Sequence, residues 1–280
     1  MLAKPPSGKL RARGLVLDLG PRPLVMGILN VTPDSFSDGG AYASADEAVA
    51  AAQRMIAEGA GMIDVGGEST RPGHAPVDAQ TELSRTVPIV ERLAQTTKVP
   101  ISIDTSKAVV AKAALKAGAH IVNDIWGLSH DAGMAAAIAE AGAAVIIMHN
   151  REQSDGTLDI FADMKRFFAD AAGKAVSAGV DSDQIVLDPG IGFGKTLEQN
   201  LSILGQLERL HEYGFPVLLG ASRKSFIGKI SPSEPADRLG GSVVTTVFAA
   251  IAGISIIRVH DVAAHVQALK VVEATSGASA

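Results

Sequence analysis

One recurring pattern most constrains how this chain can fold: a short β-branched run, a polar glycine-rich loop and a longer alanine-rich stretch with helical periodicity. The pattern occurs eight times. The predicted strands are Leu24–Leu29, Gly61–Val65, Pro100–Ile103, Ile121–Asn123, Ala143–Met148, Ile185–Leu187, Pro216–Leu219 and Ile256–Val259. The predicted helices are Ala45–Glu58, Ala79–Gln95, Lys107–Ala117, Gly133–Glu140, Ile160–Ala178, Leu197–Arg209, Pro235–Ala252 and Val262–Ala274.

Eight such units predict the α/β class and, within it, a (β/α)8 TIM barrel. A doubly wound sheet is the alternative, because periodicity does not reveal whether a sheet closes. Residues 1–23 stand outside the repeat, and Leu15–Leu19 is expected to belong to a hairpin at the base of the barrel. We expect one barrel domain over residues 24–275 and a flexible tail over 276–280.

Composition excludes several classes of function. The net charge of −5 makes nucleic acid an unexpected partner. The absence of Cys rules out disulfides, thiol nucleophiles and thiolate-bound metals. We expect no membrane association, since no apolar run approaches the roughly 20 residues of a spanning helix. The basic N-terminus lacks the apolar core of a signal peptide, which favours a cytoplasmic location.

Polar residues follow nearly every predicted strand. In a barrel of this kind the chemistry lies at the carboxyl ends of the strands. Many polar groups in one apolar mouth need a polar ligand to offset the cost of burying them. The residues at these ends are Asn30, Asp64, Asp104, Asn123, Asp124, His149, Asp188, Ser222, Arg223, Lys224, Arg258 and His260.

Three cations, Lys224, Arg258 and His260, follow the seventh and eighth strands. Loops at this position often bind phosphate, and the small residues before Arg223 allow close backbone approach. Each cation alone could instead be an ordinary surface residue. Together they indicate an anion site.

Three acceptor side chains, Asp104, Asn123 and Asp188, suit a flat heterocycle with alternating N–H and C=O groups. Helix capping is the alternative, above all for Asp104, which precedes a predicted helix. Zinc-binding His motifs are absent, so an oxygen-rich site with phosphate favours Mg²⁺. The Gly-Lys-Thr that ends the sixth loop lacks the glycine spacing of a nucleotide-binding P-loop.

Several segments resemble signatures of the dihydropteroate synthase family. The first loop contains MGILNVTPDSFSDGG from Met26 to Gly40, and the second IDVGGESTRPG from Ile63 to Gly73. Both loops are long for this architecture, and long barrel loops are usually functional or mobile. The remaining matches are Ile103-Asp104-Thr105, Asn123-Asp124, Asp188-Pro189-Gly190-Ile191-Gly192-Phe193-Gly194-Lys195, Ser222-Arg223-Lys224-Ser225 and Arg258-Val259-His260-Asp261.

The resemblance implies a homodimeric TIM barrel that joins 6-hydroxymethyl-7,8-dihydropterin diphosphate to 4-aminobenzoate for folate synthesis. It implies a pterin site with Met148 and Phe193 as lining residues, and an Mg²⁺ cofactor on Asn30. The residues expected to hold the pterin are Asp104, Asn123, Asp188 and Lys224. Those expected at the diphosphate are Thr70, Arg258 and His260, and those expected at the aminobenzoate are Phe36, Thr70, Arg71, Pro72 and Ser225. Ser222 is also expected to bind substrate, because a small residue beside the cations can offer its backbone N–H to phosphate.

Asp104, Lys224, Arg258 and His260 are the residues expected to carry the catalysis. Two alternatives stay open on sequence grounds. A pterin-barrel methyltransferase using methyltetrahydrofolate would share the pterin pocket but would have no use for the first two loops. A non-catalytic pterin-binding barrel would have no reason to keep the cations together.

Overall fold

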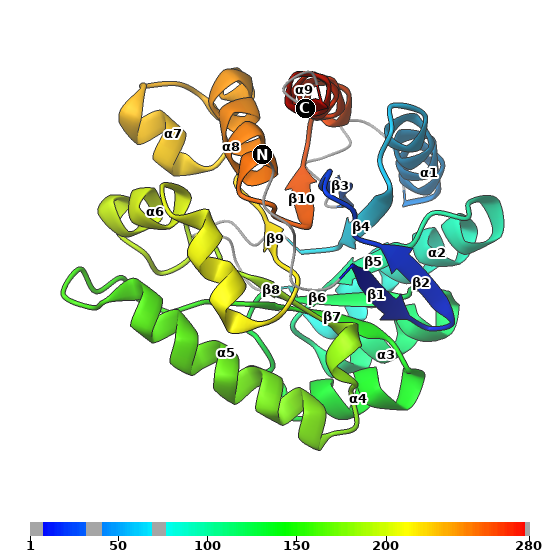
Figure 1. Cartoon of the computed structure of the whole chain (residues 1–280). Coiled ribbons are helices and arrows are strands. Elements are labelled where there is room, and N and C mark those ends of the chain that lie inside the picture. The colour runs from blue at the N-terminus through cyan, green and yellow to red at the C-terminus, as the bar shows by residue number, and fades with distance from the viewer. Residues whose placement is uncertain (1–7, 32–40, 69–76, 278–280) are drawn as a thin grey trace.

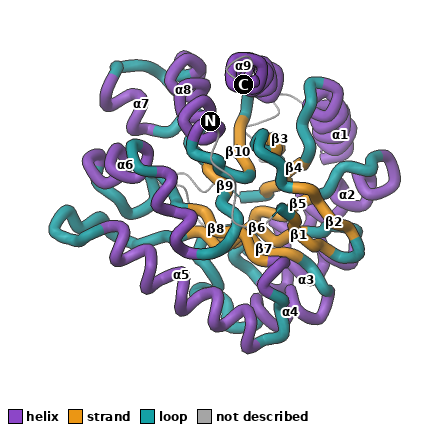
Figure 2. The backbone as a smooth tube through the Cα atoms, in the orientation of Figure 1, coloured by secondary structure: helices purple, strands orange, loops and turns teal. Residues whose placement is uncertain are grey.

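A computed structural model describes residues 8–31, 41–68 and 77–277. Eight parallel strands stand at its centre, and helices form a ring around them (Figures 1 and 2). The barrel strands are β3 (Leu24–Asn30), β4 (Met62–Gly66), β5 (Ile101–Asp104), β6 (Ile121–Asp124), β7 (Ala144–Met148), β8 (Ile185–Asp188), β9 (Leu218–Leu219) and β10 (Ile256–Val259).

The sheet closes on itself. Its strands run in the order β8-β7-β6-β5-β4-β3-β10-β9, and a parallel bridge between Leu187 and Val217 joins the two ends of this series. A doubly wound sheet would instead keep two open edges. The prediction of a TIM barrel is therefore confirmed, and the open-sheet alternative is wrong.

Helices connect the strands on the outside of the barrel. They are α1 (Ala41–Ala57), α2 (Ala79–Thr96), α3 (Ala108–Ala117), α4 (Met134–Ala141), α5 (Ile160–Ser177), α6 (Leu197–Leu204), α7 (Ser225–Ile230), α8 (Leu239–Ile251) and α9 (Val262–Gly277), with short 3-10 turns η2 (Ser182–Gln184), η3 (Leu207–Tyr213) and η4 (Pro235–Asp237). Within the described part of the chain, no helix is long and apolar enough to cross a membrane.

The structure differs from the predicted helices by more than one residue at five places. α1 begins at Ala41, four residues before its predicted start, and the helix expected over Pro235–Ala252 begins as the 3-10 turn η4 and continues as α8 from Leu239. The helix expected over Leu197–Arg209 divides at Gly205, after which the chain continues as the 3-10 turn η3. The six-residue helix α7 was not predicted, because one and a half turns carry too little periodicity to be recognised. The last helix continues to Gly277, two residues into the segment expected to be a flexible tail.

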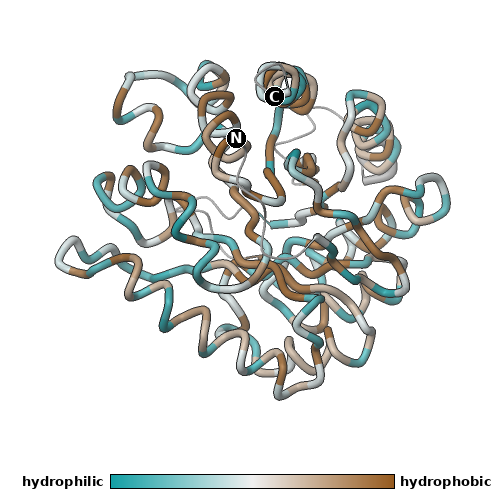
Figure 3. The backbone as a smooth tube through the Cα atoms, in the orientation of Figure 1, coloured by the Kyte–Doolittle hydropathy of each residue, from teal (hydrophilic) through white to brown (hydrophobic). Residues whose placement is uncertain are grey.

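Alternation along each strand decides which residues face the barrel interior. Val25, Ile63 and Val65 belong to the core between sheet and helices, whereas Met26 and Met62 belong to the core inside the barrel. The interior positions continue along each strand in steps of two, because successive side chains point to opposite faces. The central strands therefore contribute apolar side chains to both cores, and the tube of Figure 3 is brown, the colour of hydrophobic residues, over much of them.

A hairpin closes the amino-terminal end of the barrel, as expected. Strands β1 (Lys9–Ala12) and β2 (Leu15–Asp18) pair antiparallel. Leu10, Ala12 and Leu19 are buried and pack in the interior core with the first inward residues of the strands. The polar carboxyl ends of the strands therefore form the other end of the barrel.

Candidate functional site

Inward-facing polar residues stand at the carboxyl ends of six barrel strands. Parallel pairing places Asp104 opposite Gly66 on one side and Asn123 on the other, and Met148 opposite Asp188. Each of these positions continues the inward series of its strand, so the side chains converge in the same mouth. The six residues are Asn30, Asp64, Asp104, Asn123, Asp188 and Arg258.

Arg258 is the centre of this group. Its Nε donates to Oδ2 of Asp64 at 2.6 Å, and its Nη2 donates to Oδ2 of Asp104 at 2.7 Å. Nδ2 of Asn123 donates to the same Asp64 oxygen at 3.0 Å. Burial opposes the charge of Arg258, but the two carboxylates outweigh it and raise the pKa of the guanidinium. The pairs hold its plane in one orientation.

Three acceptor oxygens around Arg258 have no hydrogen-bond partner among the described residues. They are the Oδ1 atoms of Asp64, Asp104 and Asn123, and all three side chains are buried. A buried acceptor without a donor costs about 1–3 kcal/mol. The mouth is therefore suited to a ligand that presents several N–H groups to it.

Burial shifts the acid–base properties of Asp104. It raises the pKa of this carboxyl to about 7, because desolvation outweighs the attraction of Arg258, and nearby Asp64 adds to the rise. The helix-capping alternative for Asp104 is wrong. The amino terminus of α3 is bound instead by Asp131, whose Oδ2 accepts the N–H of Ala108 at 2.8 Å.

Asp188 and Lys224 are two further ionisable residues of this mouth, and each affects the pKa of the other. Burial raises the pKa of Asp188, with Lys224 acting in the opposite direction. Burial lowers the pKa of Lys224 to about 8 against the attraction of Asp188. Nζ of Lys224 donates to the carbonyl of Ile191 and lies 4.2 Å from the ring centroid of Phe193. Phe193 is therefore close to Lys224, one of the residues expected at the pterin.

The sixth loop packs closely on the fifth. Gly190 has φ of 64°, and a Cβ there would lie 2.1 Å from the carbonyl oxygen of His149, so only glycine fits. Lys195 is buried, and its Nζ donates to the carbonyls of His149 at 3.1 Å, Gly190 at 2.9 Å and Phe193 at 3.0 Å. This lysine was not predicted to have a role, because no sequence pattern reveals three carbonyl partners.

Ser222 and His260 meet at the ends of the seventh and eighth strands. Oγ of Ser222 lies 3.1 Å from Nδ1 of His260 and accepts the backbone N–H of His260 at 3.3 Å. Ser225 follows as the first residue of α7. The structure thus brings two of the predicted anion-binding residues together, while Arg258 is held by carboxylates instead of standing free beside them.

Four predicted site residues, Phe36, Thr70, Arg71 and Pro72, lie outside the described residues. Asp64 was noted at its strand end without a functional role. The structure makes it the partner of both Arg258 and Asn123. Its place at a strand end and within the second family signature marked Asp64 in the sequence, but neither identifies its partners until the register of the strand is known.

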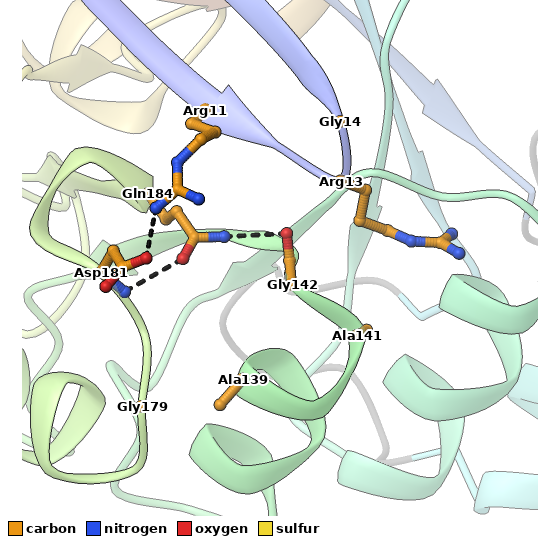
Figure 4. A pocket seen from close by; sticks show the side chains of 9 residues that line it. All are labelled: Arg11, Arg13, Gly14, Ala139, Ala141, Gly142, Gly179, Asp181 and Gln184. Atoms are coloured by element: carbon orange, nitrogen blue, oxygen red, sulfur yellow. Dashed lines mark hydrogen bonds and ion pairs between the residues drawn. The ribbon is translucent and has the colours of Figure 1, made fainter.

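A separate pocket of about 520 Å³ lies at the opposite end of the barrel, under the hairpin (Figure 4). Its polar groups bind one another. Arg11 pairs with Asp181, and Nε2 of Gln184 donates to the carbonyl of Gly142 at 2.8 Å. Figure 4 shows these contacts: the first joins the hairpin to the barrel base, and the second lies within the base.

Comparisons with known proteins point to one family. The family model described as pterin binding enzyme matches residues 26–260. The dihydropteroate synthase of Escherichia coli K12 is 48% identical over 276 residues, which cover 96% of this chain and 97% of that protein. The dihydropteroate synthase of Xanthomonas albilineans with 4-aminobenzoic acid superposes with a TM-score of 0.91 at 44% identity, covering 96% and 98% of the two chains. The dihydropteroate synthase of Yersinia pestis with a sulfonamide drug superposes with a TM-score of 0.90 at 49% identity, covering 96% of this chain and 99% of that chain.

Proposed function

Because the chain belongs to the dihydropteroate synthase family, we propose that the mouth around Arg258 is its active site. The reaction joins 6-hydroxymethyl-7,8-dihydropterin diphosphate to 4-aminobenzoate and yields 7,8-dihydropteroate and diphosphate for folate synthesis. The relatives are synthases, so neither the methyltransferase nor the non-catalytic barrel is retained. A cytoplasmic location stays a prediction of the sequence.

The unpaired oxygens of Asp64, Asp104 and Asn123 carry the assignment of the pterin site. A pterin presents an amino group and ring N–H groups along one edge, which match buried acceptors. Asp188 and Lys224 would bind the remaining edge, and Met148 and Phe193 would line the pocket. The guanidinium of Arg258, fixed by its two carboxylates, would lie flat against the ring system.

We assign the diphosphate to the side of the mouth formed by the seventh and eighth loops. Ser222 and His260 are in contact there, and Arg258 lies two residues before His260, on β10. Hydrogen-bond donors near a departing diphosphate stabilise the charge that develops on it. Thr70 is proposed to complete this side from the second loop.

Mg²⁺ is the proposed cofactor, with Asn30 as its protein ligand. Oδ1 of Asn30 lies 3.8 Å from the position that a Cβ on Gly66 would take, at the same end of the barrel as Asp104. No described group of three His, Asp or Glu side chains could hold a metal. A single amide oxygen fits Mg²⁺ because this ion keeps water ligands and shares substrate phosphates. Bound there, it would supply positive charge to the diphosphate.

A dissociative path agrees with these groups. The bond between the pterin methylene carbon and the diphosphate oxygen breaks, and its electrons leave with the diphosphate. Ionised Asp104 and Asp188 would favour the positive charge left on the ring system. The neutral amine of 4-aminobenzoate then forms the C–N bond and loses one proton, so no strong protein base is needed.

The aminobenzoate site is proposed to lie between Ser225 and the first two loops, with Phe36, Thr70, Arg71 and Pro72. These loops would hold the amine in line with the methylene carbon and exclude water from the cation. Because the Yersinia pestis relative was solved with a sulfonamide drug, we propose that a sulfonamide competes for the same site here.

A homodimer is proposed through α8. Val244, Phe248 and Ile251 occupy one face of this helix and are 50%, 49% and 53% exposed. Three neighbouring large apolar side chains at this exposure indicate a covered surface. A second copy of the chain is the occupant that the family resemblance implies.

Incorporation of radiolabelled 4-aminobenzoate into a pterin product tests the function directly. We expect product only with the dihydropterin diphosphate, diphosphate release in equal amount, and loss of turnover on chelation of Mg²⁺. Lys224→Ala should lower pterin affinity and turnover, whereas Lys229→Ala, at an exposed lysine on the helix α7 that follows Lys224, should leave both unchanged. Product formation from the diphosphate ester at normal rates in Lys224→Ala would contradict the assigned site.

A further inference from the structure

Arg223 stands between two proposed substrate-binding residues, Ser222 and Lys224, but its side chain does not join them. Its backbone has φ of 57°, in the left-handed region that residues other than glycine rarely adopt. Backbone strain of this kind persists only where the surroundings fix it. Here its N–H donates to Oγ of Ser242 at 2.8 Å, and its carbonyl accepts from Nη1 of Arg238 at 3.1 Å.

The guanidinium of Arg223 is bound by a single carboxylate. Its Nε donates to Oδ2 of Asp261 at 2.9 Å, and its Nη2 donates to Oδ1 of the same residue. This two-point pairing fixes both the distance and the orientation of the two groups. Both side chains are partly buried, at 31% and 24% exposure, so water weakens the pair less than it would at an open surface.

The pair lies one residue along the chain from the contact between Ser222 and His260. Residues 222 and 223 follow β9, and residues 260 and 261 follow β10. Ser222 touches His260, and Arg223 binds Asp261. The two contacts therefore join the same two loops side by side. Asp261 already pairs with the charge of Arg223 at two points. Arg223 is therefore not expected to bind the diphosphate directly.

We propose that Arg223 and Asp261 are positioning residues for the diphosphate of the substrate. Their ion pair holds the seventh loop against the eighth, so that Ser222 and His260 face the diphosphate together. The start of α8 fixes the backbone of Arg223, because the N-cap residue Arg238 and Ser242 of the first turns both hydrogen-bond to it. This inference rests on the proposed assignment of the diphosphate to Ser222 and His260.

Asp261→Asn and Arg223→Lys test the proposal. The first keeps the shape of the side chain and removes its charge, and the second keeps the charge and removes the planar fork. We expect either variant to raise KM for the diphosphate ester about tenfold, because hydrogen bonds between charged groups are lost. KM for 4-aminobenzoate should stay unchanged, since neither Arg223 nor Asp261 belongs to the proposed aminobenzoate site.

Two further variants make the result specific. Arg11 forms a comparable two-point pair with Asp183 at the barrel base, with Nε to Oδ2 and Nη2 to Oδ1 both at 3.1 Å. Arg11→Lys should leave both KM values unchanged. His260→Ala should raise KM for the diphosphate ester, because it removes a proposed direct contact.

Three outcomes would overturn the proposal. One is an unchanged KM for the diphosphate ester in both Asp261→Asn and Arg223→Lys while His260→Ala raises it. A second is a fall in kcat with both KM values unchanged and a lowered melting temperature, which would show a purely structural pair. If His260→Ala also leaves KM unchanged, the diphosphate lies elsewhere, and the error is then in the proposed function itself.

Discussion

Two ionisable residues at the barrel mouth, Asp104 and Lys224, have pKa values close to neutrality. Burial raises the pKa of Asp104 and lowers that of Lys224. An opposite charge, Arg258 for Asp104 and Asp188 for Lys224, reduces each shift. Removal from water disfavours the charged form of any group, whatever its sign. The carboxyl therefore becomes harder to ionise and the ammonium easier to neutralise.

These shifts predict a bell-shaped dependence of kcat/KM on pH. Asp104 must be ionised to favour positive charge on the pterin, so activity should rise as pH increases through about 7. Lys224 must be protonated, so activity should fall as pH increases through about 8. Steady-state rates between pH 5 and 10 measure both limbs.

Conservative variants assign the two limbs. Asp104→Asn should lower pterin affinity or turnover and remove the acidic limb, because its amide does not titrate. Lys224→Arg should remove the alkaline limb, because a guanidinium stays protonated throughout this range. An alkaline limb that survives in Lys224→Arg would show that another group causes it, and Lys195, whose pKa burial also lowers, would be the first to examine.

At the scale of elements, the loop after β8 depends on a glycine that no other residue can replace. The left-handed backbone of Gly190 brings it against the carbonyl of His149, and Lys195 binds both residues. The carbonyl of His149 is thus part of the surface against which the loop after β8 is fixed.

Gly190→Ala should therefore destabilise the protein and weaken pterin binding together. A left-handed alanine costs about 1–2 kcal/mol by itself, and the Cβ would also overlap the carbonyl of His149. Gly142→Ala is the matched control, with φ of 61° and nothing within 4 Å of its Cβ. In urea unfolding, Gly190→Ala should lower the free energy of unfolding clearly more than Gly142→Ala does. Equal losses in the two variants would contradict the close packing.

At the scale of the whole molecule, the amino-terminal hairpin is predicted to contribute to stability but not to chemistry. Leu10 is fully buried in the interior core, at the end opposite the mouth. Leu10→Ala should lower the free energy of unfolding by about 2–5 kcal/mol. Val16→Ala, on the exposed side of the same hairpin, should change it little. Both KM values should stay unchanged in folded protein, and a shift in either would link the hairpin to the site.

The outer face of α8 carries the prediction about assembly. Phe248→Glu places a charge in the centre of the apolar face, and we expect the variant to be monomeric in light scattering at micromolar concentration. Val109→Glu, at a 53% exposed position on α3, should stay dimeric. A monomeric unaltered protein would show that this face has another use.

The fold could be predicted closely from the sequence, and the site in part. All eight barrel strands stand within two residues of their predicted limits, because each is a short and mainly apolar run between polar or glycine-containing segments. Asp104, Asn123 and Asp188 could be placed at one mouth because parallel strands end on the same side. The partners of Arg258 could not be predicted, since Asp64 and Asp104 lie 194 and 154 residues away along the chain.

The sequence by itself determined the order of strands and helices and the family to which the signatures belong, because periodicity and local motifs are properties of neighbouring residues. Only the tertiary structure decided between a closed and an open sheet and revealed the ion pairs of Arg223 and Arg258. Those features depend on groups that become neighbours only when distant strands pair. Burial then shifts the pKa values of Asp104 and Lys224, since removal from water is a property of the folded molecule alone.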